Sequence, residues 1–410
     1  MRLLAPREAP IQPDPVEVER YFSADEVRRG AAFARPQLAL GLARSALELA
    51  ALSGLVAAGR RPDRRVPRVR IPRLRQRSVA ERLIRTPYAG GALAAARLAV
   101  GSTVLGLPLS AVARRRAKAV GLITQSWRGW AGDLAKQLMI ESVLAGGAGA
   151  AVVGLTRRYP RGWWLPAATG SVAIGTLLGA LAPVLLDPVF NDFEPLPEGE
   201  LRADILALAR AAGVEVGEVY AVDASRRTTG ANAYVTGLGP TKRVVLFDTL
   251  IDRYNRDEIR VVVAHELAHV RNRDVLRGLA FAALVAPAAA LAVQRLSWLL
   301  SPRRGPEEAL PALALAAALV TAPTALLGNR LSRALERRAD DFSLKLSRAP
   351  EAFVSFEREV ALQNVADITP PRWMSTLLAT HPPTLERIGA ALAFSRGLDA
   401  PQPSPAEAPA

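Results

Sequence analysis

The 410-residue sequence contains no cysteine, only three histidines, and few aromatic residues, which make up 5% of the chain. Without cysteine the chain forms no disulfide, uses no thiolate in catalysis and carries no thiol-linked lipid anchor. We find no internal repeat and no glycine-rich phosphate-binding loop. The polar, proline-containing start MRLLAPREAPIQPDP is not typical of a cleavable signal peptide, so we expect none.

Two of the three histidines, His265 and His269, flank Glu266 in the run VVVAHELAHV. In a helix, residues four apart lie on the same face, so both imidazoles can bind one zinc ion while Glu266 faces the bound water. The alternative is a surface helix with two incidental histidines. The spacing favours a hydrolytic metal site.

A catalytic zinc takes three protein ligands and keeps its fourth position for water, so one more ligand is needed. Glu336 and Asp340, in NRLSRALERRADDFSLKL, are also four residues apart and would share a helical face. We predict Glu336 as the third ligand and Asp340 as the carboxylate that orients a ligating histidine. His381 or a downstream carboxylate is an alternative third ligand, and an exposed helix with ion pairs would also explain ERRADD.

Five sequence blocks stand in a fixed order: SRRTTGANAYVTGLG at 225–239, KRVVLFDTLI at 242–251, HELAH at 265–269, ERRAD at 336–340 and THPPTLERI at 380–388. In this order they resemble the type I CAAX prenyl endopeptidases, which are integral-membrane zinc metalloproteases of the gluzincin kind. The resemblance extends from about residue 183 to about residue 391. It implies a membrane-embedded peptidase whose active site faces the cytoplasm.

The resemblance also implies roles for single residues. It implies that His265, His269 and Glu336 bind one Zn²⁺ per chain. It also implies that Glu266 is the general base and that Asp340 is a carboxylate behind the ligands. It places His381 beside the reacting carbonyl. It assigns the pairing with the substrate backbone to an edge-strand segment: Asn232, Ala233 and Tyr234.

The residue types support the same chemistry. Zinc lowers the pKa of a bound water to about 7, so that Glu266 can accept its proton and deliver it to the departing amine. A donor such as His381 or Tyr234 would stabilise the negative charge on the tetrahedral oxygen. The segments ANAYV and RVVLF flank a glycine turn and predict a hairpin whose edge can hold an extended peptide. A purely structural hairpin, and a His381 that only begins a helix, remain alternatives.

Half of the residues are hydrophobic, and alanine and leucine dominate them, which favours helices. Segments 163–186 and 309–327 contain no charged side chain, and roughly 20 such residues span a bilayer as a helix. Four further segments carry few charges, so that we predict six spans in all: 37–58, 91–113, 138–155, 163–186, 275–300 and 309–327. The alternative is a soluble protein with buried alanine-rich helices.

The predicted fold class is mainly α: a polytopic helical membrane protein with a small α+β zinc-metalloprotease domain. We expect that domain to contain a helix at 198–213 and a strand at 217–222, and the HELAH helix to continue into the fifth span. The predicted parts begin with an N-terminal cytoplasmic segment (1–36), four spans with a basic loop at 60–86 (37–186) and the catalytic domain (187–274). Spans five and six (275–328), a catalytic part with the third ligand (329–396) and a disordered tail (397–410) follow.

The net charge of +15 comes mostly from arginine, with eleven arginines between residues 60 and 85. Because predicted spans flank this run and no aromatic residues interleave it, anionic lipid is the expected partner and not nucleic acid. The positive-inside rule places loop 60–86 in the cytoplasm, whereas the family orientation places it outside, so the two arguments conflict. The arginine-, alanine- and proline-rich composition is typical of a GC-rich bacterial genome. Together with the predicted spans it leads us to expect a protein of the bacterial inner membrane.

Three functions remain in view. The first is a zinc endopeptidase that cuts peptides or membrane proteins near the membrane, whether prenylated or not. The second is a binding protein or transporter with a structural zinc site closed by His381 as a fourth ligand. The third is a regulatory or quality-control membrane protein with residual proteolysis. The sequence does not fix the oligomeric state.

Overall fold

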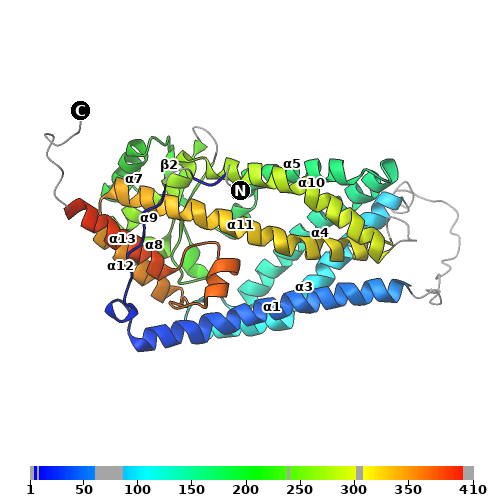
Figure 1. Cartoon of the computed structure of the whole chain (residues 1–410), viewed down its shortest axis with the longest axis horizontal. Coiled ribbons are helices and arrows are strands. Elements are labelled where there is room, and N and C mark those ends of the chain that lie inside the picture. Colours follow the sequence, from blue (N-terminus) through cyan, green and yellow to red (C-terminus); the bar gives the residue numbers. More distant parts are fainter. Residues whose placement is uncertain (1–3, 7–8, 61–85, 238–240, 302–307, 400–410) are drawn as a thin grey trace.

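The computed structural model describes residues 4–6, 9–60, 86–237, 241–301 and 308–399. Most of the basic segment 60–86 therefore lies outside the described residues. Long helices run along the molecule, and a small sheet with shorter helices forms one end (Figure 1). We call this the catalytic end.

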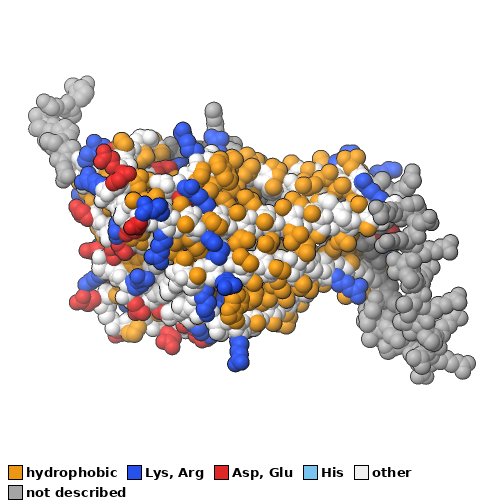
Figure 2. Space-filling model, turned by 90° about the horizontal axis from the view of Figure 1, so that it is seen from below, with side chains coloured by type: hydrophobic (Ala, Val, Ile, Leu, Met, Phe, Trp, Pro, Cys, Tyr) orange, Lys and Arg blue, Asp and Glu red, His pale blue; other side chains and the backbone are white. Residues whose placement is uncertain are grey.

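Six helices of the described chain are long and apolar enough to cross a membrane. They match the six predicted spans to within one residue at each end or extend beyond them: α1 (Ala24–Arg60), α3 (Pro87–Ala119), α4 (Trp127–Arg158), α5 (Trp164–Leu185), α10 (Asp274–Leu300) and α11 (Leu310–Ser347). Large apolar side chains such as Val143 and Leu284 point outward, being 70% and 67% exposed. Figure 2 shows this apolar surface along the helices, with Lys and Arg at its border and the acidic side chains gathered at the catalytic end. The prediction of a polytopic helical membrane protein is confirmed.

Helices α3 and α4 approach each other through small residues, as helices in membranes commonly do. A Cβ added at Gly149 of α4 would lie 2.5 Å from the Gly91 oxygen and 2.5 Å from the Ala95 Cβ, both on α3. The close contact therefore requires glycine at position 149, because any side chain there would collide with α3. It holds together two spans that are far from the catalytic end for most of their length (Figure 1).

We expect Gly149→Val to lower the thermal unfolding temperature of the protein in detergent, because overpacking of this kind costs roughly 1–3 kcal/mol. Gly147→Val is the matched control, since a Cβ at Gly147 meets no atom within 4 Å. Both variants are compared with the wild type by thermal unfolding. Equal unfolding temperatures for the two variants would contradict the close contact.

The sheet of the catalytic end has four strands in the order β1-β2-β4-β3. They are β1 (Phe193–Pro195), β2 (Glu218–Val222), β3 (Ala233–Thr236) and β4 (Arg243–Phe247). The predicted hairpin is present as the antiparallel pair β3–β4, with Ala233 opposite Leu246, and β3 is an edge strand. Gly237 has φ +99°, and a Cβ there would lie 2.3 Å from the Thr241 oxygen, so the turn requires glycine. Strand β1 has only three residues and was not predicted from the sequence.

The core of the catalytic end lies between this sheet and three helices, α7 (Glu200–Ala211), α9 (Arg256–Arg271) and α12 (Pro350–Gln363). Helix α9 begins in a capping box: the Asn255 side chain accepts from the Glu258 amide at 3.0 Å, and Glu258 accepts from the Asn255 amide at 2.9 Å. Its face with Val263 and Leu267 is fully buried. Shorter helices complete this end: α6 (Asp187–Phe190), α8 (Asp248–Arg253), η1 (Val18–Arg20), η2 (Ala224–Arg226), η4 (Met374–Leu378) and α13 (Thr384–Asp399).

The expectation that the HELAH helix continues into the fifth span is wrong. Helix α9 ends at Arg271, and α10 begins at Asp274. Arg273 between them has left-handed dihedrals, φ 54° and ψ 43°, which break the helical path. The sixth span does continue without interruption into the helix of Glu336, since α11 is one helix. Helix α13 extends to Asp399, into the segment expected to be disordered, and residues 400–410 lie outside the described chain.

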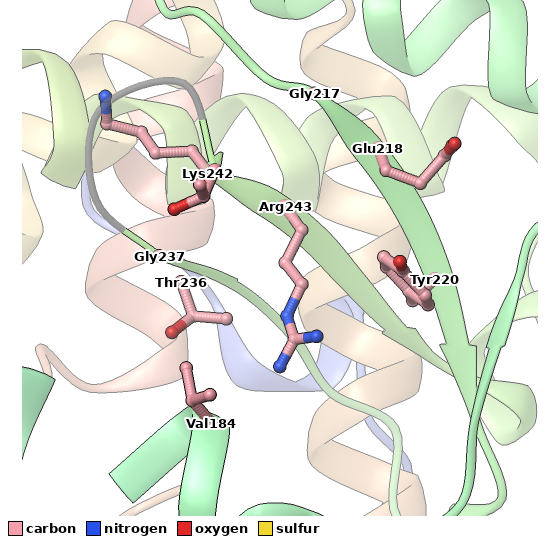
Figure 3. Close-up of a pocket in the computed structure, with 9 residues that line it drawn as sticks. Val184, Gly217, Glu218, Tyr220, Thr236, Gly237, Lys242 and Arg243 are labelled. Atoms are coloured by element: carbon pink, nitrogen blue, oxygen red, sulfur yellow. The ribbon is translucent and has the colours of Figure 1, made fainter. Parts of the chain in front are cut away.

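Two groups of contacts join the sheet to the membrane helices. Figure 3 shows the first, a cavity of about 320 Å³ into which Arg243 of β4 reaches toward Val184 of α5. The guanidinium donates to the Pro183 oxygen at 3.0 Å and lies 5.3 Å from the ring centres of Phe193 and Tyr220. Arg243 thereby fixes the end of α5 to the sheet.

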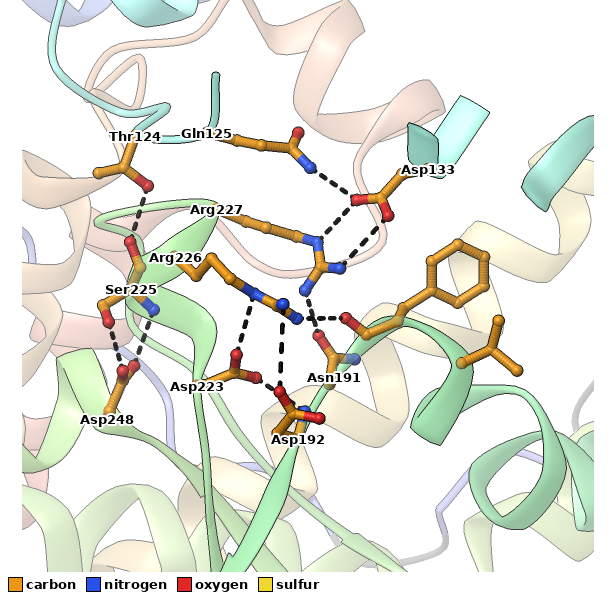
Figure 4. A network of polar contacts seen from close by, with 12 residues as sticks. Thr124, Gln125, Asp133, Asn191, Asp192, Asp223, Ser225, Arg226, Arg227 and Asp248 are labelled. Atoms are coloured by element: carbon orange, nitrogen blue, oxygen red, sulfur yellow. Dashed lines mark hydrogen bonds and ion pairs between the residues drawn. The ribbon is translucent and has the colours of Figure 1, made fainter. Parts of the chain in front are cut away.

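Figure 4 shows the second group, built around the two arginines of the SRRTTG segment. Arg227 forms an ion pair with Asp133 of α4 at 2.9 Å and donates to Asn191 Oδ1 at 3.0 Å. Arg226 forms an ion pair with Asp223 at 3.0 Å. The chain that leads into edge strand β3 is therefore tied to a membrane helix.

Candidate metal centre and active-site cleft

Two helices bring the predicted metal ligands together. His265 and His269 lie one turn apart on α9, and Glu336 lies on α11, which packs across α9. The Nε2 atoms of the two histidines are 3.2 Å apart. The Glu336 carboxylate oxygens are 3.3 Å from His265 Nε2 and 3.7 Å from His269 Nε2. The three side chains converge although 67 residues separate His269 from Glu336 (336 − 269).

The arrangement fits a divalent cation. Each histidine directs Nδ1 at a carboxylate, which can only accept, so in the neutral imidazoles the proton is on Nδ1 and the Nε2 lone pairs are left for a cation. Glu336 Oε2 is buried, and no donor among the described residues reaches it in hydrogen-bond geometry. The ligand atoms of the three residues all lie within 4.8 Å of one another. Two imidazole lone pairs and an orphaned buried carboxylate oxygen form a donor set that suits zinc.

Asp340 and Asp274 hold the two histidines from behind. Asp340 accepts from His265 Nδ1 at 2.8 Å, as the sequence predicted for a carboxylate of α11. Asp274, at the beginning of α10, accepts from His269 Nδ1 at 3.0 Å. Sequence reasoning missed Asp274, because a continuous helix would have turned it away from His269. The left-handed backbone of Arg273 redirects the chain, so that the Asp274 carboxylate faces His269.

A buried arginine completes the support of Asp340. Arg387 of α13 donates to both carboxylate oxygens of Asp340, at 2.9 and 2.6 Å, and forms an ion pair with Glu357 of α12 at 2.7 Å. This arginine lies in the THPPTLERI block, to which the sequence analysis gave no role beyond His381. A bidentate arginine fixes a carboxylate in both position and angle. His265 is therefore oriented by a chain of contacts from α11, α12 and α13.

A cleft of about 440 Å³ opens on this centre. Its lining includes His265, Glu266, His381, Asn232 and Phe353. The Glu266 carboxylate forms no hydrogen bond or ion pair with any described residue, so it is free to move a proton. Burial raises the pKa of Glu266 above the usual range for glutamate, which makes it a stronger base.

His381 stands at the rim of the cleft. Its side chain is 60% exposed, and its Nε2 is 3.3 Å from Glu336 Oε2. The Thr380 hydroxyl lies 2.9 Å from its Nδ1. Among the described residues the set of converging ligand atoms contains three members and does not include His381. The imidazole is thus close to the centre and open to solvent.

The predicted substrate-pairing residues take different places. Asn232 is exposed and lines the cleft, whereas Ala233 is 3% exposed and packs in the core. Tyr234 does not line the cleft, and its hydroxyl is 3.5 Å from Asp187 Oδ2. Burial and the nearby Asp187 charge raise the pKa of Tyr234 to about 12, so the phenol stays protonated at neutral pH. The structure therefore places Asn232, but neither Ala233 nor Tyr234, in the lining of the cleft that contains His265 and Glu266.

Comparisons with known proteins agree with this geometry. Residues 195–394 match the model of peptidase family M48, and residues 12–192 match the model described as CAAX prenyl protease N-terminal, five membrane helices. Within residues 12–192, the described chain has four candidate spans. The chain is 30% identical to the uncharacterized metalloprotease YhfN of Bacillus subtilis over 300 residues, which are 71% of this chain and 70% of that protein.

Eukaryotic relatives match over shorter stretches. A CAAX prenyl protease 1 homolog of Oryza sativa is 33% identical over 53% of both chains, and CAAX prenyl protease 1 of Saccharomyces cerevisiae is 34% identical over 38% of this chain and 34% of that one. The chain thus spans about half the length, or less, of these two relatives. The fold is similar to the crystal structure of S. mikatae Ste24p, with a TM-score of 0.73, 22% identity and coverage of 92% and 91% of the two chains.

The fold and the site together define an integral-membrane metalloendopeptidase of the CAAX prenyl protease type. The chain belongs to peptidase family M48. It acts on peptide bonds, uses a metal, and resides in a lipid bilayer.

Proposed function

We propose that this protein is a zinc-dependent endopeptidase that binds one Zn²⁺ per chain and hydrolyses peptide bonds at the membrane surface. The observation that carries the proposal is the convergence of His265, His269 and Glu336 beside an unpaired Glu266. The ion supplies Lewis-acid chemistry, lowering the pKa of water and polarising the scissile carbonyl. The described ligand set has three members, which supports a catalytic site and not a closed structural one.

Protein side chains carry out proton transfer, stabilise the oxyanion and orient the ligands. Glu266 removes a proton from the attacking water and returns it to the departing amine. His381 lies close enough to the centre to donate to the oxygen of the tetrahedral intermediate. Asp340 and Asp274 keep both imidazoles in the tautomer that presents Nε2 to the ion.

The substrate is an extended peptide segment, held by main-chain hydrogen bonds along the free edge of β3. Asn232 at the start of that edge lines the same cleft as Glu266, which supports this path. Backbone pairing places little demand on side chains, so peptides and membrane-protein segments of varied sequence fit. A prenylated CAAX tail, after which several relatives are named, is one substrate to be compared in the assay.

We infer that the catalytic end faces the cytoplasm of a bacterial inner membrane. Basic residues at this end, on α1 and around the α3–α4 connection, support that orientation under the positive-inside rule: Arg28, Arg29, Arg35, Arg114, Arg115, Arg116, Lys118 and Arg128. The absence of cysteine permits a direct test by single introduced cysteines. In intact cells, an impermeant maleimide should label Gly162→Cys, between α4 and α5, and spare Glu215→Cys at the catalytic end. The reverse pattern would overturn the orientation.

Removal of the metal tests the activity itself. Purified protein in detergent should cleave a quenched fluorescent peptide, lose more than about 90% of this activity in 1,10-phenanthroline, and regain it with added zinc. The 1,7-isomer, which does not chelate, is the control. Elemental analysis should give one zinc per chain. Activity that is unchanged by chelation, or cleavage confined to samples without bound metal, would refute the proposal. Cleavage rates of peptides with and without a farnesyl group then show which substrate is preferred.

A further inference from the structure

A second cleft, of about 770 Å³, lies between the end of α9, the first turns of α10, the last turns of α11 and residues 4–6. We refer to it as the basic cleft. Five cations line it against a single carboxylate: Arg271, Arg273, Arg277, Arg338 and Lys345, with Asp341. None of these residues has a role in the proposed peptidase mechanism.

The existing contacts leave most of this charge unneutralised. Arg271 donates to the Ala212 carbonyl at 2.7 Å, a neutral acceptor. Arg277 donates to the Leu4 carbonyl at 3.0 Å, and it shares the Asp274 carboxylate, 3.8 Å away, with Arg338. The side chains of Arg273 and Lys345 are exposed and form no hydrogen bond or ion pair with any other described residue. The Asp341 carboxylate already accepts from the Ile11 amide at 3.0 Å.

Among the cations of the basic cleft, Arg338 has the closest acidic partner. It pairs with Asp274, the carboxylate that accepts from His269 Nδ1. Its Nε is buried and has no hydrogen-bond partner among the described residues. The basic cleft therefore lies directly behind the carboxylate that orients one metal ligand.

The walls of the basic cleft are apolar on the side of the membrane. Leu276 and Ala280, on the first turns of the membrane helix α10, line it. Val275 and Leu276 are 75% and 57% exposed, although both belong to a helix that enters the apolar part of the molecule. Figure 1 places this region where α10 and α11 leave the catalytic end, beside the N-terminal residues. The cations of the basic cleft thus lie next to an exposed apolar surface of α10.

We propose that the basic cleft binds the headgroup of an anionic phospholipid from the leaflet at the catalytic end. The phosphate would lie among Arg273, Arg277 and Lys345, and the acyl chains would follow the exposed apolar face of α10. Basic pockets between membrane helices are suited to such headgroups. A nucleic acid would gain nothing from the apolar wall. This site goes beyond the proposed peptidase function and does not depend on it.

Native mass spectrometry of the full-length protein, purified in a mild detergent, tests this site with phosphatidylglycerol as the probe. The test variant is Arg273→Asn with Lys345→Gln, since asparagine tolerates the left-handed backbone at position 273. Each cation near a membrane surface contributes about a fivefold factor in binding, so we expect phosphatidylglycerol affinity to fall about 30-fold. Thermal unfolding and metal content check that the variant is folded.

The matched control is Arg115→Gln with Arg128→Gln, which removes the same charge from the end of α3 and the start of α4, at the same end of the helices. We expect this control to bind phosphatidylglycerol as the wild type does. Phosphatidylcholine with the same acyl chains should bind at least about 10-fold more weakly, and glycerol phosphate should not compete. Equal losses in both double variants, equal binding of the two lipids, or competition by glycerol phosphate alone would each overturn the proposal.

Discussion

The Glu266→Gln variant is expected to lose about 10³- to 10⁴-fold in kcat while it keeps its metal. Glutamine has nearly the same shape as glutamate but cannot accept a proton, so water at the centre would keep its proton in the variant. The ligands are untouched, because Glu266 forms no hydrogen bond or ion pair with any of the described residues. Peptide cleavage by purified protein gives kcat, and elemental analysis gives the zinc content.

Asp257→Asn is the matched control for Glu266→Gln. Asp257 lies on the same helix, its side chain is 64% exposed, and its ion pair with Arg260 is a surface contact. We expect its activity to stay within about twofold of wild type, because a surface pair of this kind contributes little to stability. A Glu266→Gln protein with full activity would show that another group acts as the base. A metal-free Glu266→Gln protein would show that the side chain supports the ligands.

The residues of the candidate metal centre could be picked out from the sequence because their spacing is helical. His265 and His269 are one turn apart, and so are Glu336 and Asp340, so the spacing alone places each pair on a common helix face. The sixth span and the helix of Glu336 are continuous in the structure, because α11 is one helix. What spacing could not give is the packing of α11 across α9, which makes the two pairs meet.

The support of the two histidines was predictable for only one of them. Asp340 follows Glu336 by one turn, whereas Asp274 reaches His269 only because Arg273 is left-handed. An arginine in this conformation has no sequence signal, since glycine and asparagine are the usual residues there. Arg387 was missed for a different reason: it supports Asp340 from a helix about fifty residues downstream, and a lone arginine does not indicate such a partner.

The edge strand shows a further limit of sequence reasoning. The alternation of ANAYV and RVVLF around a glycine turn predicted the β3–β4 hairpin. It could not tell which side chains face the metal centre, because the side of the sheet covered by α9 is decided by the fold. Asn232 faces the cleft, while Ala233 enters the core and Tyr234 approaches Asp187. A substrate that pairs with this edge would therefore meet backbone more than side chains.

The Glu336→Gln variant is expected to lose the metal, and with it all measurable peptidase activity. The change replaces the only carboxylate of the converging ligand set by a neutral amide, which is a poor ligand for zinc. Loss of a group that merely orients a ligand typically lowers metal affinity 10- to 100-fold, so loss of a ligand should exceed about 100-fold. Competition with a chromogenic chelator of known affinity measures this directly.

Glu351→Gln, an exposed position on α12, is the matched control for Glu336→Gln, and it should retain wild-type zinc content and activity. The pair of variants at Glu266 and Glu336 then separates two kinds of failure: the first keeps zinc without turnover, and the second loses both. If Glu336→Gln bound zinc as tightly as the wild type, the third ligand would have to be another side chain. His381, whose Nε2 lies 3.3 Å from Glu336 Oε2, would be the group to replace next. If His381→Ala lost zinc and Glu336→Gln kept it, the metal site would have to lie nearer the rim of the cleft. Glu336 would then be a buried partner of the imidazoles and not a ligand.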